Sequence, residues 1–149
     1  MDYVLTYADR GFSGNPYAAG MDRTYSLDAL PQEYPSLGTG DYRNIALNIK
    51  NEKGVESADL LFKSYEIRSG KYQLQGLPAV WADENEAQTL EIVLADENAQ
   101  VEVHLLYGVL EETDIITRSV RIKNMGTGQI TIEKAAAACL DLSLIHISE

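Results

Sequence analysis

The side chains best suited to bind a polar ligand lie near the N-terminus, between Asp9 and Arg43. The ionised carboxylate of Asp9 can accept two hydroxyl protons in strong charge-assisted hydrogen bonds. The alternative is an aspartate that starts a turn and bonds its own backbone. We predict that Asp9 contacts a ligand, because charged residues on long loops often serve recognition.

Arg23 is the second candidate binding residue of this stretch. Its guanidinium group could orient a carboxylate or contact a ligand across a subunit interface, since it offers several donors in a fixed plane. The alternative is a local ion pair with Asp22, Asp28 or Asp41 that only fixes the loop. The sequence supports both readings equally.

The stretch that carries these residues must be held by the rest of the chain. It has no helix or strand periodicity, and loops of this length in compact domains are usually functional or disordered. Its apolar anchors argue against disorder: Phe12, Tyr17, Tyr25, Tyr34 and Tyr42. We expect Tyr34 and Tyr42 to pack with hydroxyls in water. We expect an internal polar network from Gln32, Glu33, Asp41 and Arg43.

The other polar residues are interpreted as structural, so the sequence gives no catalytic residue and no metal ligand. Asp83–Glu86 and Asp96–Asn98 lie between strand-like runs and are expected to be solvated turns, because neither has the ligand spacing of a calcium loop. His104 has no nearby Cys or His and is expected to be a satisfied structural histidine. Cys139 is expected to be a small buried core residue.

Composition limits the class of protein. With 149 residues the chain suits one domain, and its net charge of −11 argues against nucleic acid and anionic membranes as partners. No apolar run has the length of a membrane span, and the first residues lack the pattern of a signal peptide. The single cysteine allows no internal disulfide, so we expect a cytoplasmic protein.

From Asn44 onward the sequence predicts strands separated by turns. The expected runs are 45–49, 60–68, 89–94, 101–109, 116–122 and 130–132. The alanines within Glu133–Leu142 favour helix by propensity, but the run lacks caps, so we predict a strand there. Strands without intervening helices indicate an all-β fold, an antiparallel β-sandwich.

Several motifs, in order, resemble the N-terminal domain of bacterial α-galactosidases of glycoside hydrolase family 36. They are 12–16, 22–35, 38–43, 76–79, 89–92 and 116–120. The resemblance implies a galactose-mutarotase-like β-supersandwich that precedes a catalytic (β/α)8 barrel and is here truncated at both ends. It divides the chain into a strand remnant and functional loop (1–43), a sandwich core (44–142) and a tail outside the family pattern (143–149).

The resemblance also implies roles. In the family, the nucleophile and acid/base of this retaining hydrolysis lie in the barrel, no cofactor is needed, and the full-length enzymes are oligomeric. Asp9 matches a family aspartate that hydrogen-bonds sugar hydroxyls in a neighbouring subunit's active site. The fragment is thus expected to be inactive alone, with α-galactoside sugars, the barrel and further copies as partners.

Two alternatives remain open from the sequence. The chain could be a stand-alone carbohydrate-binding module that stacks sugars on Trp81, although core or rim packing is the expectation for that residue. It could also be a purely structural interaction domain, whose aromatic loop forms a subunit interface.

Overall fold

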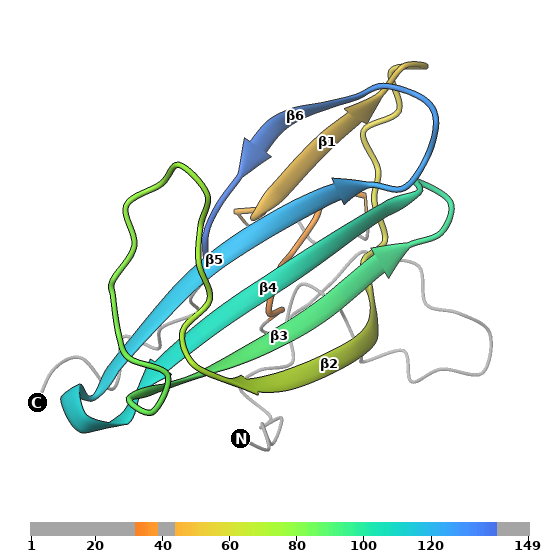
Figure 1. Cartoon of the computed structure of the whole chain (residues 1–149). Helices are drawn as coiled ribbons and strands as arrows, with labels where there is room; N and C mark the ends of the chain where they lie inside the picture. The colour runs from red at the N-terminus through yellow and green to blue at the C-terminus, as the bar shows by residue number, and fades with distance from the viewer. Residues whose placement is uncertain (1–31, 39–43, 140–149) are drawn as a thin grey trace, which may run out of the picture.

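The computed structural model describes residues 32–38 and 44–139, which form two antiparallel sheets (Figure 1). The all-β prediction is confirmed. The predicted binding residues Asp9 and Arg23 lie outside the described residues, as do Tyr42, Asp41 and Arg43. None of the described residues belongs to a helix long and apolar enough to cross a membrane.

The larger sheet has four strands in the order β2-β3-β4-β5, each antiparallel to its neighbour. Each strand overlaps one of the runs that the sequence predicts. The bounds are β2 Leu61–Ser69, β3 Ala87–Asp96, β4 Val101–Leu110 and β5 Ile115–Asn124. A short 3-10 turn, η3 (Glu111–Thr113), joins β4 to β5.

The smaller sheet pairs β1 (Leu47–Asn51) with β6 (Ile130–Ala135). The predicted strand beyond Glu133 is confirmed as far as Ala135, and residues 136–139 are irregular rather than helical. Pairing with β1 therefore overrides the helix propensity of the alanines. The remainder of that run, 140–142, lies outside the described residues.

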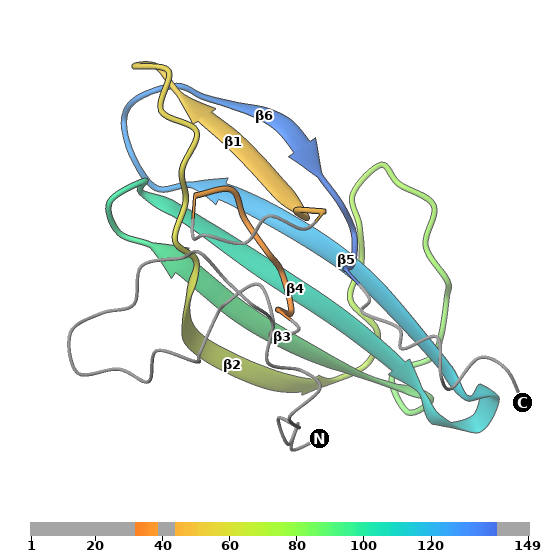
Figure 2. The same ribbon diagram turned by 180° about the vertical axis from the view of Figure 1, so that it is seen from behind.

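The hydrophobic core lies between the two sheets. Leu47 and Ile49 of β1 belong to the same buried cluster as Val101, Val103 and Leu105 of β4. Leu47, Val103 and Leu105 have no exposed surface. Residues 32–38 run beside β1 on this inner side of the larger sheet, as seen from behind in Figure 2.

The loop between β2 and β3 is attached to the outer face of the larger sheet by Tyr72. The Tyr72 N–H donates to Thr89 Oγ1 at 2.8 Å, and its hydroxyl donates to Ser119 Oγ at 3.2 Å. Gly108 leaves space for this ring, because a Cβ there would lie 3.2 Å from Tyr72 Cε1 and 2.6 Å from Thr117 Oγ1.

Two expectations about residues 81–98 are wrong. Trp81, expected to pack in the core or its rim, is 77% exposed in the loop between β2 and β3. Asp96, expected in a solvated turn, is 7% exposed. The prediction holds for Asp83–Glu86, which are exposed in a turn before β3.

Candidate functional site

The described end of the N-terminal loop is bonded to the smaller sheet through its backbone. The Pro35 carbonyl accepts from Ala46 N–H at 2.8 Å and from Leu47 N–H at 3.2 Å. Leu37 N–H donates to the Leu47 carbonyl at 3.3 Å, and the Leu37 carbonyl accepts from Ala58 N–H at 2.9 Å. This end of the loop is therefore part of the folded core.

The side chains of the same segment are buried with it. Tyr34 is 4% exposed, and its hydroxyl donates to the Ala136 carbonyl at 2.8 Å. The expectation of a hydroxyl in water is therefore wrong for Tyr34. Burial raises the pKa of Tyr34 to about 12, with the charge of Arg118 acting weakly in the opposite direction. Ser36 Oγ donates to the Ala58 carbonyl at 2.6 Å.

Glu33 connects the loop to the larger sheet. Its carboxylate contacts the Arg118 guanidinium group on β5 and accepts from the Tyr107 hydroxyl on β4. Arg118 Nη2 also donates to the Glu33 carbonyl at 3.3 Å. The sequence predicts partners for Glu33 inside the loop, whereas this carboxylate pairs with the sheet. We call Glu33, Tyr107 and Arg118 the Glu33 clamp.

The environment of the Glu33 clamp is asymmetric. The Arg118 side chain is 13% exposed and the Glu33 side chain 55% exposed, so the cation is fixed and the anion reaches it from the surface. Burial and the hydrogen bond to Glu33 raise the pKa of Tyr107. The raised pKa keeps the Tyr107 hydroxyl protonated beside the Glu33 carboxylate, so the clamp serves attachment and not nucleophilic attack.

The sequence did not identify Tyr107 or Arg118 as site residues. Their pairing across β4 and β5 follows from strand register, but their partner Glu33 lies 74 and 85 residues away. The only available signal was the motif 116–120, which contains Arg118.

A second polar cluster lies on the outer face of the larger sheet. His104 Nδ1 is 2.7 Å from Glu91 Oε1, and Nε2 is 3.5 Å from Glu102 Oε2. Lys63 and Arg68 of β2 bond these carboxylates at 2.5 Å. Among the residues with described positions, no group of acids, histidines and cysteines could hold a metal ion. His104 Nδ1 thus has the partner expected of a structural histidine, whereas its buried Nε2 makes no hydrogen bond within the part of the chain that the structure describes.

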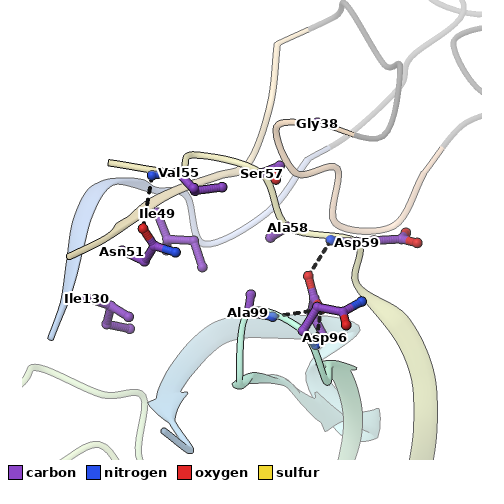
Figure 3. A pocket seen from close by; sticks show the side chains of 11 residues that line it. Gly38, Ile49, Asn51, Val55, Ser57, Ala58, Asp59, Asp96, Ala99 and Ile130 are labelled. Atoms are coloured by element: carbon purple, nitrogen blue, oxygen red, sulfur yellow. Dashed lines mark hydrogen bonds between the residues drawn. The ribbon is translucent and has the colours of Figure 1, made fainter. Parts of the chain in front are cut away.

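A cavity of about 240 Å³ opens between β1 and the β3–β4 turn (Figure 3). The polar atoms at its edge are largely engaged in local structure. Asp96 Oδ2 accepts from Asp59 N–H at 2.7 Å, and Oδ1 accepts from Asn98 and Ala99 N–H at 2.8 and 3.0 Å. Asn51 Oδ1 likewise accepts from Val55 N–H at 2.9 Å. With these acceptors occupied, the cavity is a weak candidate for a polar ligand.

Cys139 is half-buried at the edge of the core, with Sγ 4.0 Å from the Asn44 carbonyl. The predicted core position is therefore only partly correct. The predicted binding residues Asp9 and Arg23 are not described, so the geometry neither joins them to the Glu33 clamp nor separates them from it.

Comparisons with known proteins assign the chain to a family. The family model of the glycosyl hydrolase family 36 N-terminal domain matches residues 5–147. The bifunctional α-galactosidase/sucrose kinase AgaSK of Mediterraneibacter gnavus is 96% identical over 141 residues, which cover 95% of this chain and 15% of that protein. Alpha-galactosidase 1 of Pediococcus pentosaceus is 41% identical over 136 residues, 91% of this chain and 18% of that protein.

Solved structures support the same family assignment. The galactosidase domain of AgaSK matches with a TM-score of 0.85 and 96% identity, covering 94% of this chain and 20% of that one. The family 36 α-galactosidase AgaA of Geobacillus stearothermophilus, in complex with raffinose, matches with a TM-score of 0.81 and 42% identity, over 90% of this chain and 18% of that one. The chain thus spans 15% of the length of the Mediterraneibacter gnavus protein and 18% of the length of the Pediococcus pentosaceus protein.

Proposed function

The chain belongs to the glycosyl hydrolase family 36 N-terminal domain family, and from this premise we propose that it is the non-catalytic first domain of an α-galactosidase. The whole enzyme hydrolyses terminal α-D-galactosyl residues of oligosaccharides. The support is the 96% identity to a galactosidase domain of which this chain covers 20%. Because the family's nucleophile and acid/base belong to the barrel, this domain needs no catalytic residue and no cofactor of its own.

Its contribution to activity is a substrate contact from the N-terminal loop. Asp9 accepts hydrogen bonds from sugar hydroxyls, and Arg23 orients the sugar or a barrel carboxylate nearby. An ionised carboxylate suits this task because it accepts two hydroxyl protons at once. The attachment of residues 32–38 to both sheets supports the proposal, since a loop that lends a side chain to a site needs a fixed base.

The partners of the domain are the catalytic barrel and further copies of the same enzyme. Support comes from the edge strand β2, where Phe62, Tyr65 and Ile67 are each more than 60% exposed. Register places these three side chains opposite Leu94, Ile92 and Leu90, on the side of the sheet that faces the core. Exposed apolar groups in such a row typically mark a surface that another body covers. The cytoplasmic location expected from the sequence stays a prediction.

The experiment for the non-catalytic role is hydrolysis of a chromogenic α-galactoside by the purified chain. We expect no turnover above the buffer rate, while the full-length enzyme at the same molar concentration releases the chromophore. Clear turnover by the pure chain refutes a non-catalytic domain.

A stand-alone carbohydrate-binding module is the second candidate function, and the exposure of Trp81 favours it. A flat aromatic side chain that is 77% exposed is available to stack on a sugar face. Calorimetry of the chain with melibiose at millimolar concentration separates the two functions. Saturable binding that Trp81→Ala abolishes and the control Phe62→Ala retains supports the module. Absence of binding supports the enzyme domain.

The third candidate is a purely structural domain. It predicts that Asp9→Ala leaves the KM of the full-length enzyme unchanged, whereas a substrate contact predicts an increase.

A further inference from the structure

We propose that a cavity on the outer face of the larger sheet binds a small dianion of the phosphate type. The cavity has a volume of about 260 Å³ and is lined by residues of β2, β3, β4, β5 and the start of the loop between β2 and β3. That loop passes over the outer side of β4 and β5 (Figure 1). A dianion site there is independent of the galactoside contact proposed above.

The charge of the cavity is opposite to that of the protein. Three of the twelve basic side chains line it, those of Arg68, Lys71 and Arg121, and none of the described residues around it is acidic. The whole chain has 23 acidic residues and a net charge of −11. Cations that surround a concave surface without an acid create a local positive potential, which attracts anions.

Two of these cations have no carboxylate partner within the described part of the chain. Arg121 makes no ion pair and no hydrogen bond there. The Lys71 ammonium lies 3.9 Å from the centre of the Tyr72 ring and 3.4 Å from the Tyr72 carbonyl oxygen. A ring and a carbonyl stabilise an ammonium without neutralising it. Only Arg68 has a counter-ion, Glu91, so an anion that enters the cavity meets two uncompensated charges.

Hydrogen bonds between the loop and the sheet fix the wall of the cavity. Thr89 Oγ1 accepts from Tyr72 N–H at 2.8 Å and donates to the Gly70 carbonyl at 2.7 Å. Gly108 leaves space for the Lys71 stem, because a Cβ there would lie 3.2 Å from Lys71 Cε. Lys71 is half-buried in this position. A wall that is already in place lowers the entropic cost of binding a ligand.

The donors and the size of the cavity indicate the class of anion. A guanidinium group suits the oxygens of a phosphate, and a lysine ammonium binds them as a point charge. The exposed side chains of Ser69 and Gln73 add donors at the rim. Pockets for drug-sized ligands have volumes of about 300 to 1,000 Å³. The smaller cavity here therefore suits inorganic phosphate, or the phosphate group of a small ester, better than a whole nucleotide.

Calorimetric titration with inorganic phosphate tests the site, at about pH 8 where phosphate is largely a dianion. The full-length enzyme and the 149-residue chain are titrated separately at matched ionic strength. We expect saturable binding to both, weakened by about tenfold in Arg121→Gln because one charge-assisted hydrogen bond is lost. Lys71→Gln is expected to weaken binding to a similar extent. Undiminished affinity in both variants overturns the site.

Lys123→Gln is the matched control for the loss of one positive charge. Lys123 lies on β5 two residues after Arg121, on the same face, but does not line the cavity. Its substitution is expected to leave the phosphate affinity unchanged. Equal losses in Lys123→Gln and Arg121→Gln, or heat that does not saturate, show an adventitious ion only and overturn the site. Because Arg121 is exposed and unpaired among the described residues, Arg121→Gln is expected to keep the Tm of the parent without phosphate.

The two titrations also distinguish a free dianion from a carboxylate supplied by another part of the enzyme. Phosphate that binds the 149-residue chain but not the full-length enzyme shows that the cavity is covered there, which overturns a site for a free anion. Acetate, a monoanion, is expected to bind at least about tenfold more weakly than phosphate, because the attraction to the cations scales with charge. Equal affinities for acetate and phosphate contradict a dianion site.

Discussion

Tyr107 and Arg118 lie opposite each other on β4 and β5, and the guanidinium group stacks on the phenol ring with 4.6 Å between its carbon and the ring centre. Both side chains contact the carboxylate of Glu33, which comes from the opposite end of the chain. The pair thereby connects the sheet to the loop on which the proposed function depends.

Tyr107→Phe tests the hydroxyl of this pair while it keeps the ring. The variant loses one hydrogen bond to a carboxylate, so the free energy of unfolding in urea is expected to fall by about 1 kcal/mol. Tyr65→Phe is the control, because Tyr65 is 65% exposed on β2 and its change is expected to stay within about 0.5 kcal/mol. Equal losses in the two variants contradict the role of the Tyr107 hydroxyl.

Tyr34 makes the protein sensitive to alkali. Its pKa is raised from 10.0 to about 12, so above pH 10 the unfolded chain ionises while the folded Tyr34 stays neutral. The stabilisation is complete below the unfolded pKa and is lost as pH rises toward the folded one. Tyr34→Phe is therefore expected to reduce the loss of unfolding free energy between about pH 8 and about pH 11. Part of the loss of unfolding free energy is expected to remain in Tyr34→Phe, because the pKa of Tyr107 is raised as well.

Urea unfolding of the parent chain and the Tyr34→Phe variant at both pH values provides the measurement. An unchanged pH dependence in Tyr34→Phe shows that the Tyr34 hydroxyl is not protected from ionisation in the folded chain.

Asp96 is expected to be a large single contributor to stability at the β3–β4 turn. Its carboxylate is buried and accepts three backbone N–H groups, those of Asp59, Asn98 and Ala99. Asp96→Ala leaves these donors without their partner, which is expected to lower the unfolding free energy by about 3 kcal/mol. Asp83→Ala, in an exposed turn, is the control with an expected change near zero. Similar losses at both positions argue against the buried carboxylate as the cause.

Glu102 links stability to acid pH. The hydrogen bond from Lys63 holds the pKa of Glu102 below its usual 4.5, with the charges of Lys63, Lys123 and His104 acting in the same direction. A lowered folded pKa contributes stability above the unfolded value and loses it as pH falls through the folded one. Glu102→Gln is therefore expected to lower Tm at neutral pH and to approach the Tm of the parent in acid, as pH falls through the folded pKa of Glu102.

Scanning calorimetry at neutral and acid pH checks this dependence. Glu66→Gln, on the exposed strand β2, serves as the control that removes a carboxylate without breaking the Lys63 bond. A Tm deficit of Glu102→Gln that persists unchanged in acid contradicts an ionic origin.

The strands were predictable because their sequence is locally consistent with the fold. Val101, Val103 and Leu105 alternate with residues of the outer face, and such alternation specifies a half-buried strand without help from distant residues. Asn51–Gly54 predicts its turn for the same reason, since Gly54 supplies the positive φ of 79° that the turn needs. The resemblance to family 36 likewise rested on contiguous motifs.

The remaining features depend on contacts between distant residues. Asp96 reads as a turn aspartate, and only the packing of Asp59 over it makes it a buried acceptor. Glu33 reads as one more acid in a charged loop, because nothing near it in sequence indicates Arg118. Trp81 was expected in the core or its rim from the resemblance to family 36, whereas it is exposed in the loop that Tyr72 attaches to the sheet.

The most direct measurement is the steady-state kinetics of Asp9→Asn in the full-length enzyme, with melibiose as substrate. Asparagine keeps the size of the side chain and removes the charge of the acceptor. A KM raised by about tenfold at unchanged kcat is the predicted result, because a contact made equally in the ground state and the transition state is lost. A KM equal to that of the parent enzyme contradicts the account and leaves the domain without a role in substrate binding.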